Sequence, residues 1–301
     1  MIVFQEDRIS KAIPGRLPDG PAIIMAAPQE SGQAVALAGI VVVPGFPGAE
    51  EQSIHFESRE DYDYLSLYLP DFSGAEDDAE PLECYLTRER LVVIGGGEVF
   101  GRLHRSLETD SSIHRNPVQA LALLFNLILV EVAQPLETVD DAIDSLEEKA
   151  ARRKPEDHAS EIIALRKHLA AIKHCFDALY DLLEELEENR NNLFTKNQLQ
   201  LFRAYKNKIN RLANRTLNLR EHLTQVREAF QNQLDISLND TMRFFTVITA
   251  IFLPLTLIVG WYGMNLRMPE LESAITYPVI IGVSLGFIAI SLFFCKKKGW
   301  F

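Results

Sequence analysis

The sequence predicts an α+β cytoplasmic domain followed by a long helical stalk that is continuous with the first of two transmembrane helices. In the first part of the chain, β-branched runs are bounded by Pro and Gly, which is typical of strands and turns. Between Glu156 and Leu253 there is no Gly or Pro, so this stretch can form only a few long helices. Residues 244–262 and 278–295 are apolar and uncharged, and each run approaches the roughly 20 residues that cross a hydrocarbon core.

The composition argues against some partners and activities of the protein. The 301 residues carry a formal net charge of −12, which argues against nucleic acid as a partner because no basic face is available. An acidic surface is compatible with cations as ligands, or with solubility alone. The sequence contains no nucleophile–base constellation and no cofactor fingerprint, so we expect no enzyme activity, no catalytic residues and no cofactor.

The distribution of basic residues predicts the orientation in the membrane. Arg227 and Arg243 precede the first apolar run and Lys296–Lys298 follow the second, whereas the segment between the runs carries only Arg267. By the positive-inside rule, both termini lie in the cytoplasm of a multi-pass protein of the cell inner or plasma membrane. The first ten residues do not resemble a signal peptide. The three cysteines are far apart, as expected of a reducing compartment.

Residues 1–115 are predicted to form a mixed α/β cytoplasmic head. "PAIIMAAP" (21–28) and "VALAGIVVVPGF" (35–46) carry apolar, β-branched runs bounded by Pro and Gly, which indicate strands. "DYDYLSLYL" (61–69) alternates polar and apolar side chains, the pattern of a half-buried strand. "LECYLTRERLVVIGGG" (82–97) indicates two short strands around a turn.

Residues 116–190 are predicted to form a helical hairpin region. Its first helix opens at an Asn-Pro pair, and its apolar stretch 120–130 is too short to span a membrane, so we expect a helix buried against the sheet. A second helix is expected near 156–188. It should end in the Asn-rich stretch 188–192, where side-chain amides compete with the helix for hydrogen bonds.

Residues 191–262 are predicted to form the stalk helix. From Thr195 it meets no helix breaker before Pro254, so it would be on the order of 100 Å long. Its apolar or small residues recur in steps of three and four, which is the spacing of a heptad seam. These positions are Phe202, Tyr205, Ile209, Leu212, Thr216, Leu219, Leu223, Val226 and Phe230. The seam must pack either against other copies of the chain or against the preceding helix.

The C-terminal segments complete the predicted membrane domain. The stalk runs into the first transmembrane helix at about 244–262, and an outer loop follows at 263–277. The second transmembrane helix covers 278–295, and 296–301 form a basic cytoplasmic tail. Two spanning helices enclose no path for a solute, so we expect a funnel-shaped homo-oligomer that could surround a pore.

Three short motifs at the C-terminal end carry a resemblance to a known family. "YGMN" (262–265) ends the first apolar run, "MPEL" (268–271) follows in the loop, and "KKKGWF" (296–301) follows the second run. In this arrangement the chain resembles the CorA-type magnesium and divalent-cation transporters, for which the Gly-Met-Asn tripeptide is the hallmark. The resemblance covers 195–301, and over 1–190 it extends to the order of elements.

The resemblance implies a homopentamer in which five first spans surround a central pore. Gly263, Met264 and Asn265 would form the selective outer pore mouth, with a ring of Asn265 amides. The pore-lining positions implied by the family are Asn239, Met242, Phe245, Leu253 and Thr256. Phe245 and Leu253 depart from the Leu and Met that are common there. The stripe is polar at its ends and apolar between, as expected of a pore that closes by dewetting.

The resemblance also implies how cations are attracted and sensed. Amide oxygens of Asn265 can hydrogen-bond to the water shell of Mg²⁺, which loses water reluctantly, without the tight binding of a carboxylate ring. Glu270 and Glu272 would enrich cations near the outer loop through their charge. Glu228, with Asp235 behind it, would hold a regulatory cation, so Mg²⁺ would be both the transported and the regulatory ion.

Two alternatives remain open at this point. The chain could transport zinc, cobalt or nickel, because a zinc-transporting branch of the superfamily shares the architecture. From another class, it could be a membrane-anchored coiled-coil sensor whose two helices are only anchors. The expected partners are therefore divalent cations, further copies of the chain and the lipid bilayer.

Overall fold

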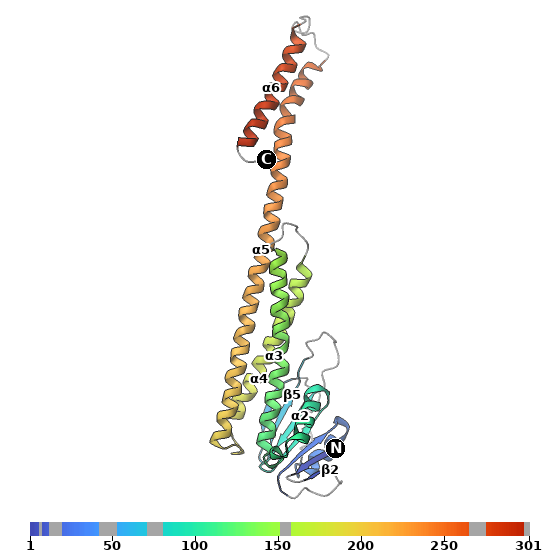
Figure 1. Ribbon diagram of the computed structural model, residues 1–301, viewed down its shortest axis with the longest axis vertical. Helices are drawn as coiled ribbons and strands as arrows, with labels where there is room; N and C mark the ends of the chain where they lie inside the picture. The colour runs from blue at the N-terminus through green and yellow to red at the C-terminus, as the bar shows by residue number, and fades with distance from the viewer. Residues whose placement is uncertain are drawn as a thin grey trace. The chain divides into compact units, whose positions relative to one another are not determined.

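The computed structural model describes most of the chain, and Figure 1 shows its ribbon. The described residues are 1–5, 8–11, 20–41, 53–70, 81–150, 158–264 and 275–297. The chain divides into two compact units. The first consists of Met1–Glu148 and Asp157–Val226, and the second consists of Lys149–Glu156 and Arg227–Phe301.

Within the described residues, a single seven-stranded sheet organises the N-terminal part of the first unit. The strands are β1 (Ile2–Gln5), β2 (Arg8–Lys11), β3 (Ala22–Ala26), β4 (His55–Ser58), β5 (Asp63–Leu67), β6 (Leu82–Leu86) and β7 (Arg90–Ile94). Their order is β2-β1-β3-β7-β6-β5-β4. The β3–β7 pair is parallel and every other pair is antiparallel. The α+β class predicted from the sequence is confirmed.

Most of the predicted strands are present, but one is wrong. The strands predicted within 21–28, 61–69 and 82–97 are β3, β5 and the β6–β7 pair. All five residues of β5 are buried, so this strand is covered more completely than its alternating pattern indicated. The stretch 35–46, predicted as a strand, instead begins inside the helix α1 (Ser31–Leu37), and its residues 42–46 lie outside the described part of the chain.

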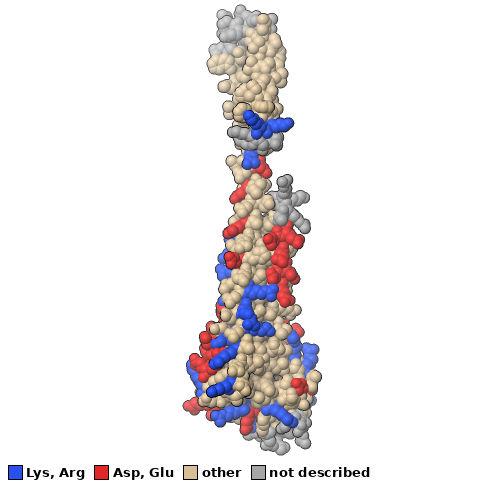
Figure 2. All heavy atoms as spheres, turned by 60° about the vertical axis from the view of Figure 1, so that its left-hand side comes forward, with Lys and Arg blue, Asp and Glu red and all other residues tan. Residues whose placement is uncertain are grey.

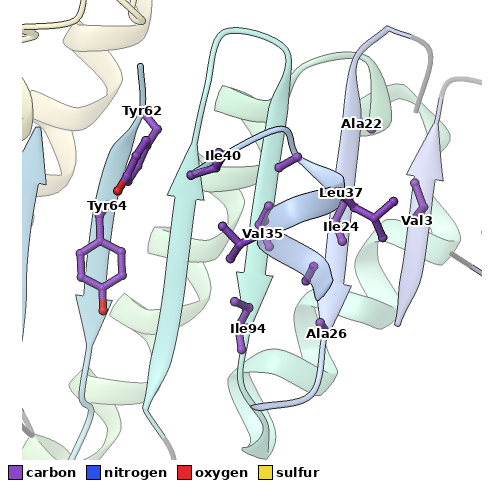
Figure 3. Packing of buried hydrophobic residues seen from close by; sticks show 13 residues of the cluster. Val3, Ala22, Ile24, Ala26, Val35, Leu37, Ile40, Tyr62, Tyr64 and Ile94 are labelled. Carbon is purple, nitrogen blue, oxygen red and sulfur yellow. The ribbon is translucent and has the colours of Figure 1, made fainter. Parts of the chain in front are cut away.

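Helix α1 forms because its apolar residues pack at helical spacing against the sheet. It follows a single turn, η1 (Pro28–Glu30), with Pro at its start, where a missing N–H costs nothing. Val35 and Leu37 are buried, and Figure 3 shows them in front of β3 and β7. Gly39, with φ of 74°, follows the helix in the left-handed conformation that glycine adopts without strain. Val35 is the only β-branched residue of this helix, and the β-branched run 40–43 that indicated a strand comes after it in the sequence.

The other helices of the described residues begin at residue 97 or later. They are α2 (Gly97–Thr109), the short η2 (Ser111–Arg115), α3 (Pro117–Ala150), α4 (Ala159–Glu187), α5 (Lys196–Tyr262) and α6 (Thr276–Lys297). The apolar window of α3 is 61% buried, against 6% for α5 and 0% for α6. The sequence prediction that 120–130 lie in a buried helix is therefore confirmed.

The α4–α5 connection shows how asparagine ends one helix and starts the next. Asn189 and Asn192 have φ of 48° and 52°, a left-handed conformation that Asn tolerates better than most residues. The Asn189 side chain donates to the Phe194 carbonyl and accepts from the Phe194 N–H, both at 3.0 Å. The break predicted at 188–192 is therefore confirmed, together with its cause.

Hydrogen bonds from Asn191 join this connection to the start of strand β5. Its Nδ2 donates to Oδ1 of Asp63 at 2.8 Å and to the Tyr62 carbonyl at 3.2 Å. Asp63 is only 1% exposed. Burial raises the pKa of Asp63, while hydrogen bonds from Ser58 and Asn191 act in the opposite direction.

We expect Asn191→Ala to lower the free energy of unfolding by about 1–3 kcal/mol at neutral pH, because a buried carboxylate loses a donor. The native pKa of Asp63 lies above its ordinary value of 3.8. The folded state therefore binds this proton more tightly, and the stability falls as the pH rises through the interval between the two values. Asn191→Ala removes a hydrogen bond that lowers the pKa of Asp63, so it raises this pKa in the folded state further. The stability difference between the variant and the wild type should therefore shrink towards pH 4 or below.

Urea unfolding at several pH values measures this effect. The exposed Asn207 on α5 provides a matched control, because Asn207→Ala removes an amide that is not buried. If the loss of stability in Asn191→Ala does not change with pH, it comes from the missing hydrogen bond and not from the ionisation of Asp63, and the predicted pH dependence is wrong.

The heptad seam of α5 is covered within the chain itself. Every seam position from Phe202 to Val226 is buried or partly buried. Helix α3 contributes Phe125, whose ring lies 5.8 Å from that of Phe202. Helix α4 contributes Glu187, which accepts from Lys206 Nζ at 2.8 Å. The seam therefore packs against preceding helices, and it does not provide a free surface for other copies.

Candidate functional site

Up to Val226 one face of α5 is buried, whereas beyond it most residues of α5 are exposed. Leu234, Ile236 and Leu238 are 47%, 55% and 62% exposed. Most of the stability of a helix in a protein comes from packing of its apolar face, and large apolar side chains rarely gather on a free surface. We therefore expect the apolar side chains between Leu234 and Leu238 to pack against another surface, which the described residues of this chain do not provide.

The described residues contain two exposed helices that are suited to a lipid environment. The most apolar windows of α5 and α6 have mean hydropathies of 2.1 and 2.4, and they are almost entirely exposed. Figure 2 shows this end of the chain as a surface nearly free of charged side chains. Lys296 and Lys297 stand in the last turn of α6. Two membrane-spanning helices, as predicted from the sequence, fit these properties.

The five predicted pore-lining residues lie on one face of α5. They are Asn239, Met242, Phe245, Leu253 and Thr256, and all five are exposed in the single chain. At 3.6 residues per turn, these positions fall within an arc of roughly 120°. Asn239 stands at one end of this stripe, which is apolar through Met242, Phe245 and Leu253. We call this face the pore stripe of α5.

Two open grooves follow the pore stripe. One, of about 590 Å³, is lined by residues that include Met242, Phe245 and Leu253. The other, of about 740 Å³, is lined by residues that include Leu253 and Thr256. Thr249 and Leu253 line both grooves, so the two hollows meet along the helix.

Thr249 is a stripe residue that the sequence analysis missed. It stands four residues after Phe245 and four before Leu253, so it fills the long step between these two predicted positions. The helical repeat alone could have identified it. Its Oγ1 donates to the Phe245 carbonyl at 2.8 Å, and Thr256 makes the same bond to the Phe252 carbonyl at 2.8 Å. Both hydroxyls are thereby satisfied as donors and keep acceptor lone pairs for water or a cation.

The start of the Gly-Met-Asn motif is described, and its glycine is required by close contact. The Gly263 N–H donates to the Val259 carbonyl at 2.8 Å, which extends the helical pattern past Tyr262. A Cβ at Gly263 would lie 2.8 Å from that same oxygen, so a larger residue would displace the backbone. Met264 is exposed. Asn265, Glu270 and Glu272 lie outside the described residues, and their predicted roles stay predictions.

The predicted regulatory residues are exposed and separate. Glu228 and Asp235 are both exposed on α5, on the same arc as the pore stripe. Within the described residues, neither belongs to a group of side chains that converges on a metal ion. Their assignment to a regulatory site therefore stays a prediction.

Together these features define a class of protein: an integral membrane protein with an α/β unit, a long helix whose last part is apolar enough to span a membrane, and a second apolar helix after it. The chain belongs to the family of CorA-like Mg²⁺ transporter proteins, which it matches over residues 48–297.

Known proteins support this assignment. The cobalt/magnesium transport protein CorA of Thermotoga maritima is 28% identical over 243 residues, which cover 78% of this chain and 69% of the relative. That of Methanocaldococcus jannaschii is 24% identical over 260 residues, covering 84% and 82%. The complete structure of the CorA magnesium transporter from Methanocaldococcus jannaschii has the same fold. It aligns with a TM-score of 0.84 at 22% identity, covering 100% of this chain and 98% of the other.

Proposed function

We propose that the chain forms a homopentameric channel that passes Mg²⁺ down its electrochemical gradient through the inner or plasma membrane. The observation that carries the proposal is the pore stripe of α5, which places Asn239, Thr249 and Thr256 on one face of an otherwise mainly apolar helix segment. A membrane anchor needs no such arrangement, because lipid would favour apolar residues all around the helix. Five copies that turn this face towards a common axis would enclose a path.

The same arrangement would cover the exposed part of α5. The seam up to Val226 is occupied by α3 and α4, so contacts between copies must use other surfaces. Leu234 and Leu238 are one turn apart and exposed, which suits contact with a neighbouring copy. The family to which the chain belongs supports this assembly.

Ion recognition in the proposed channel begins at Asn265. Five amide oxygens would accept hydrogen bonds from the water shell of Mg²⁺, so that the ion enters without losing its water. Glu270 and Glu272 would raise the local cation concentration outside. Inside, the apolar side chains of Met242, Phe245 and Leu253 would form constrictions that close by dewetting.

Control of the channel would come from the cytoplasmic side. With both termini in the cytoplasm, Glu228 and Asp235 face the cell interior and provide carboxylate oxygens, which Mg²⁺ prefers. A high internal Mg²⁺ concentration would occupy them and favour the closed state. Mg²⁺ would thus be the transported and the regulatory ion, with no further cofactor.

Ion-resolved flux into liposomes that contain the purified protein tests the proposal. Mg²⁺ entry that follows the membrane potential and persists without a pH gradient is the expected result. Faster entry of Zn²⁺, Co²⁺ or Ni²⁺ than of Mg²⁺ would identify a different cargo for the same architecture. The absence of flux for every ion would instead indicate a membrane-anchored sensor.

We expect Thr249→Val to lower Mg²⁺ flux by about 2- to 10-fold, which corresponds to the loss of one hydrogen bond of about 0.5–1.5 kcal/mol to a hydrated ion. Valine keeps the shape of the side chain and removes only its hydroxyl. Thr224 is the matched control, because its Oγ1 makes the same bond to the Arg220 carbonyl, at 2.9 Å, outside the apolar segment. An unchanged flux in Thr249→Val would place this residue away from the ion path.

A further inference from the structure

Away from the pore stripe, the described residues bring together one group of side chains that could hold a metal ion. Asp144 and Glu147 lie one turn apart on α3, so their side chains share a face of that helix. His222 of α5 faces them, with its Nε2 3.2 Å from Oε2 of Glu147. One ligand atom from each of the three residues lies within 4.8 Å of the other two.

The two helices beneath this group are held together by packing. Leu146 of α3 and Leu223 of α5 stand next to the group in sequence and are buried. Two turns before His222 on α5, Arg215 Nη2 donates to Oδ2 of Asp140 at 2.7 Å and joins the same pair of helices. The backbone positions of the three residues are therefore fixed by the core of the first compact unit, and only their side chains, two of them exposed and one partly buried, need to adjust.

The spacing of the three groups is close to that of a metal site. Ligand atoms at about 2.0–2.2 Å from an ion lie roughly 3–3.5 Å from one another. The Nε2–Oε2 distance between His222 and Glu147 already meets this requirement. The Asp144 carboxylate is exposed, so rotation about its side-chain bonds can bring it to the same distance.

The ligand types determine which ions fit. One imidazole nitrogen with two carboxylate oxygens suits Zn²⁺, Co²⁺ and Ni²⁺, and water can complete the coordination. Mg²⁺ takes oxygen ligands and keeps several waters, so an imidazole adds little for it. The group therefore discriminates against the ion that we propose as cargo.

We propose that Asp144, Glu147 and His222 form a binding site for a first-row transition-metal ion that bridges α3 and α5. The bound ion ties α3 to α5 one turn before Val226, where the buried part of α5 ends. The site lies in the soluble unit, on residues separate from the pore stripe, and its existence does not depend on ion transport. An ion pair between His222 and Glu147 alone is the competing interpretation.

Titration of the purified full-length protein with Co²⁺ distinguishes the two. The protein is freed of metal with a chelator and kept in excess Mg²⁺, which fills sites that consist only of oxygen ligands. We expect one equivalent of Co²⁺ per chain with the visible absorption of a nitrogen-coordinated ion. His222→Ala and Glu147→Gln should each weaken this binding at least ten-fold, because even partners outside the coordination shell are worth about 10–100-fold.

A matched control and a second measurement complete the test. His174→Ala, which removes an exposed imidazole from α4, should bind Co²⁺ like the wild type. Zn²⁺ should raise the thermal unfolding midpoint of the wild type and not that of His222→Ala. Equal Co²⁺ affinity in the wild type and His222→Ala would overturn the proposal, as would loss of the signal in excess Mg²⁺. Neither result depends on ion flux, so this proposal and the channel proposal fail separately.

Discussion

Replacement of Asn265 by alanine is expected to reduce Mg²⁺ uptake by proteoliposomes at least ten-fold. In the proposed pentamer, each Asn265 amide oxygen accepts a hydrogen bond from the water shell of the entering ion. A hydrogen bond to a charged group is worth about 1.5–3 kcal/mol, and about 1.4 kcal/mol corresponds to a factor of ten. The initial rate of Mg²⁺ entry, measured with an indicator dye inside the vesicles, provides the test.

Two further variants make this result specific. Asn218→Ala removes an exposed amide from the soluble part of α5 and should leave uptake unchanged. Asn265→Gln keeps the amide but lengthens the side chain, so uptake should fall less than in Asn265→Ala. Normal uptake by Asn265→Ala, at the same amount of protein in the vesicles, would reject the proposed ring of amides.

Phe202→Ala is expected to cause the largest loss of folding stability, about 3–5 kcal/mol. Phe202 is fully buried where α5 meets α3. Its ring lies 5.3 Å from that of Phe194, 5.8 Å from that of Phe125 and 6.3 Å from that of Tyr205, so the truncation removes three aromatic contacts and leaves a cavity. Urea unfolding of the detergent-solubilised protein, followed by circular dichroism, measures the loss.

A substitution at the neighbouring Leu201 distinguishes the loss of packing from a change in helix propensity. Leu201 precedes Phe202 on the same helix but is 41% exposed, so Leu201→Ala should cost about 1 kcal/mol or less. Phe202→Leu keeps most of the buried apolar volume and should fall between the two. If Phe202→Ala and Leu201→Ala unfold at the same urea concentration, the α3–α5 contact does not support the fold.

The sequence predicted the features that depend on local chemistry. The stretch without Gly or Pro forms α4 and α5, since a helix closes its hydrogen bonds within four residues. The connection at Asn189 followed from the same local reasoning. The two apolar C-terminal helices were recognisable because length and hydropathy set the requirement for a span.

Features that depend on distant contacts were not predictable in the same way. The stretch 35–46 was predicted as one strand because of its Ile and Val run at 40–43, but its first residues belong to the helix α1, which ends before Gly39 and packs against β3 and β7. The heptad seam allowed two partners, and the sequence of one chain does not distinguish them. The group of Asp144, Glu147 and His222 joins residues far apart in the chain, and no spacing rule connects them.

The internal burial of the α5 seam has a consequence for biogenesis. The first compact unit ends at Val226, before the apolar windows of α5 and α6, and the buried core of its described residues is formed by residues of this unit. During synthesis it can therefore fold before the first span leaves the ribosome. A newly made chain would then reach the lipid with its first unit already folded, and only the two apolar helices would remain to be inserted.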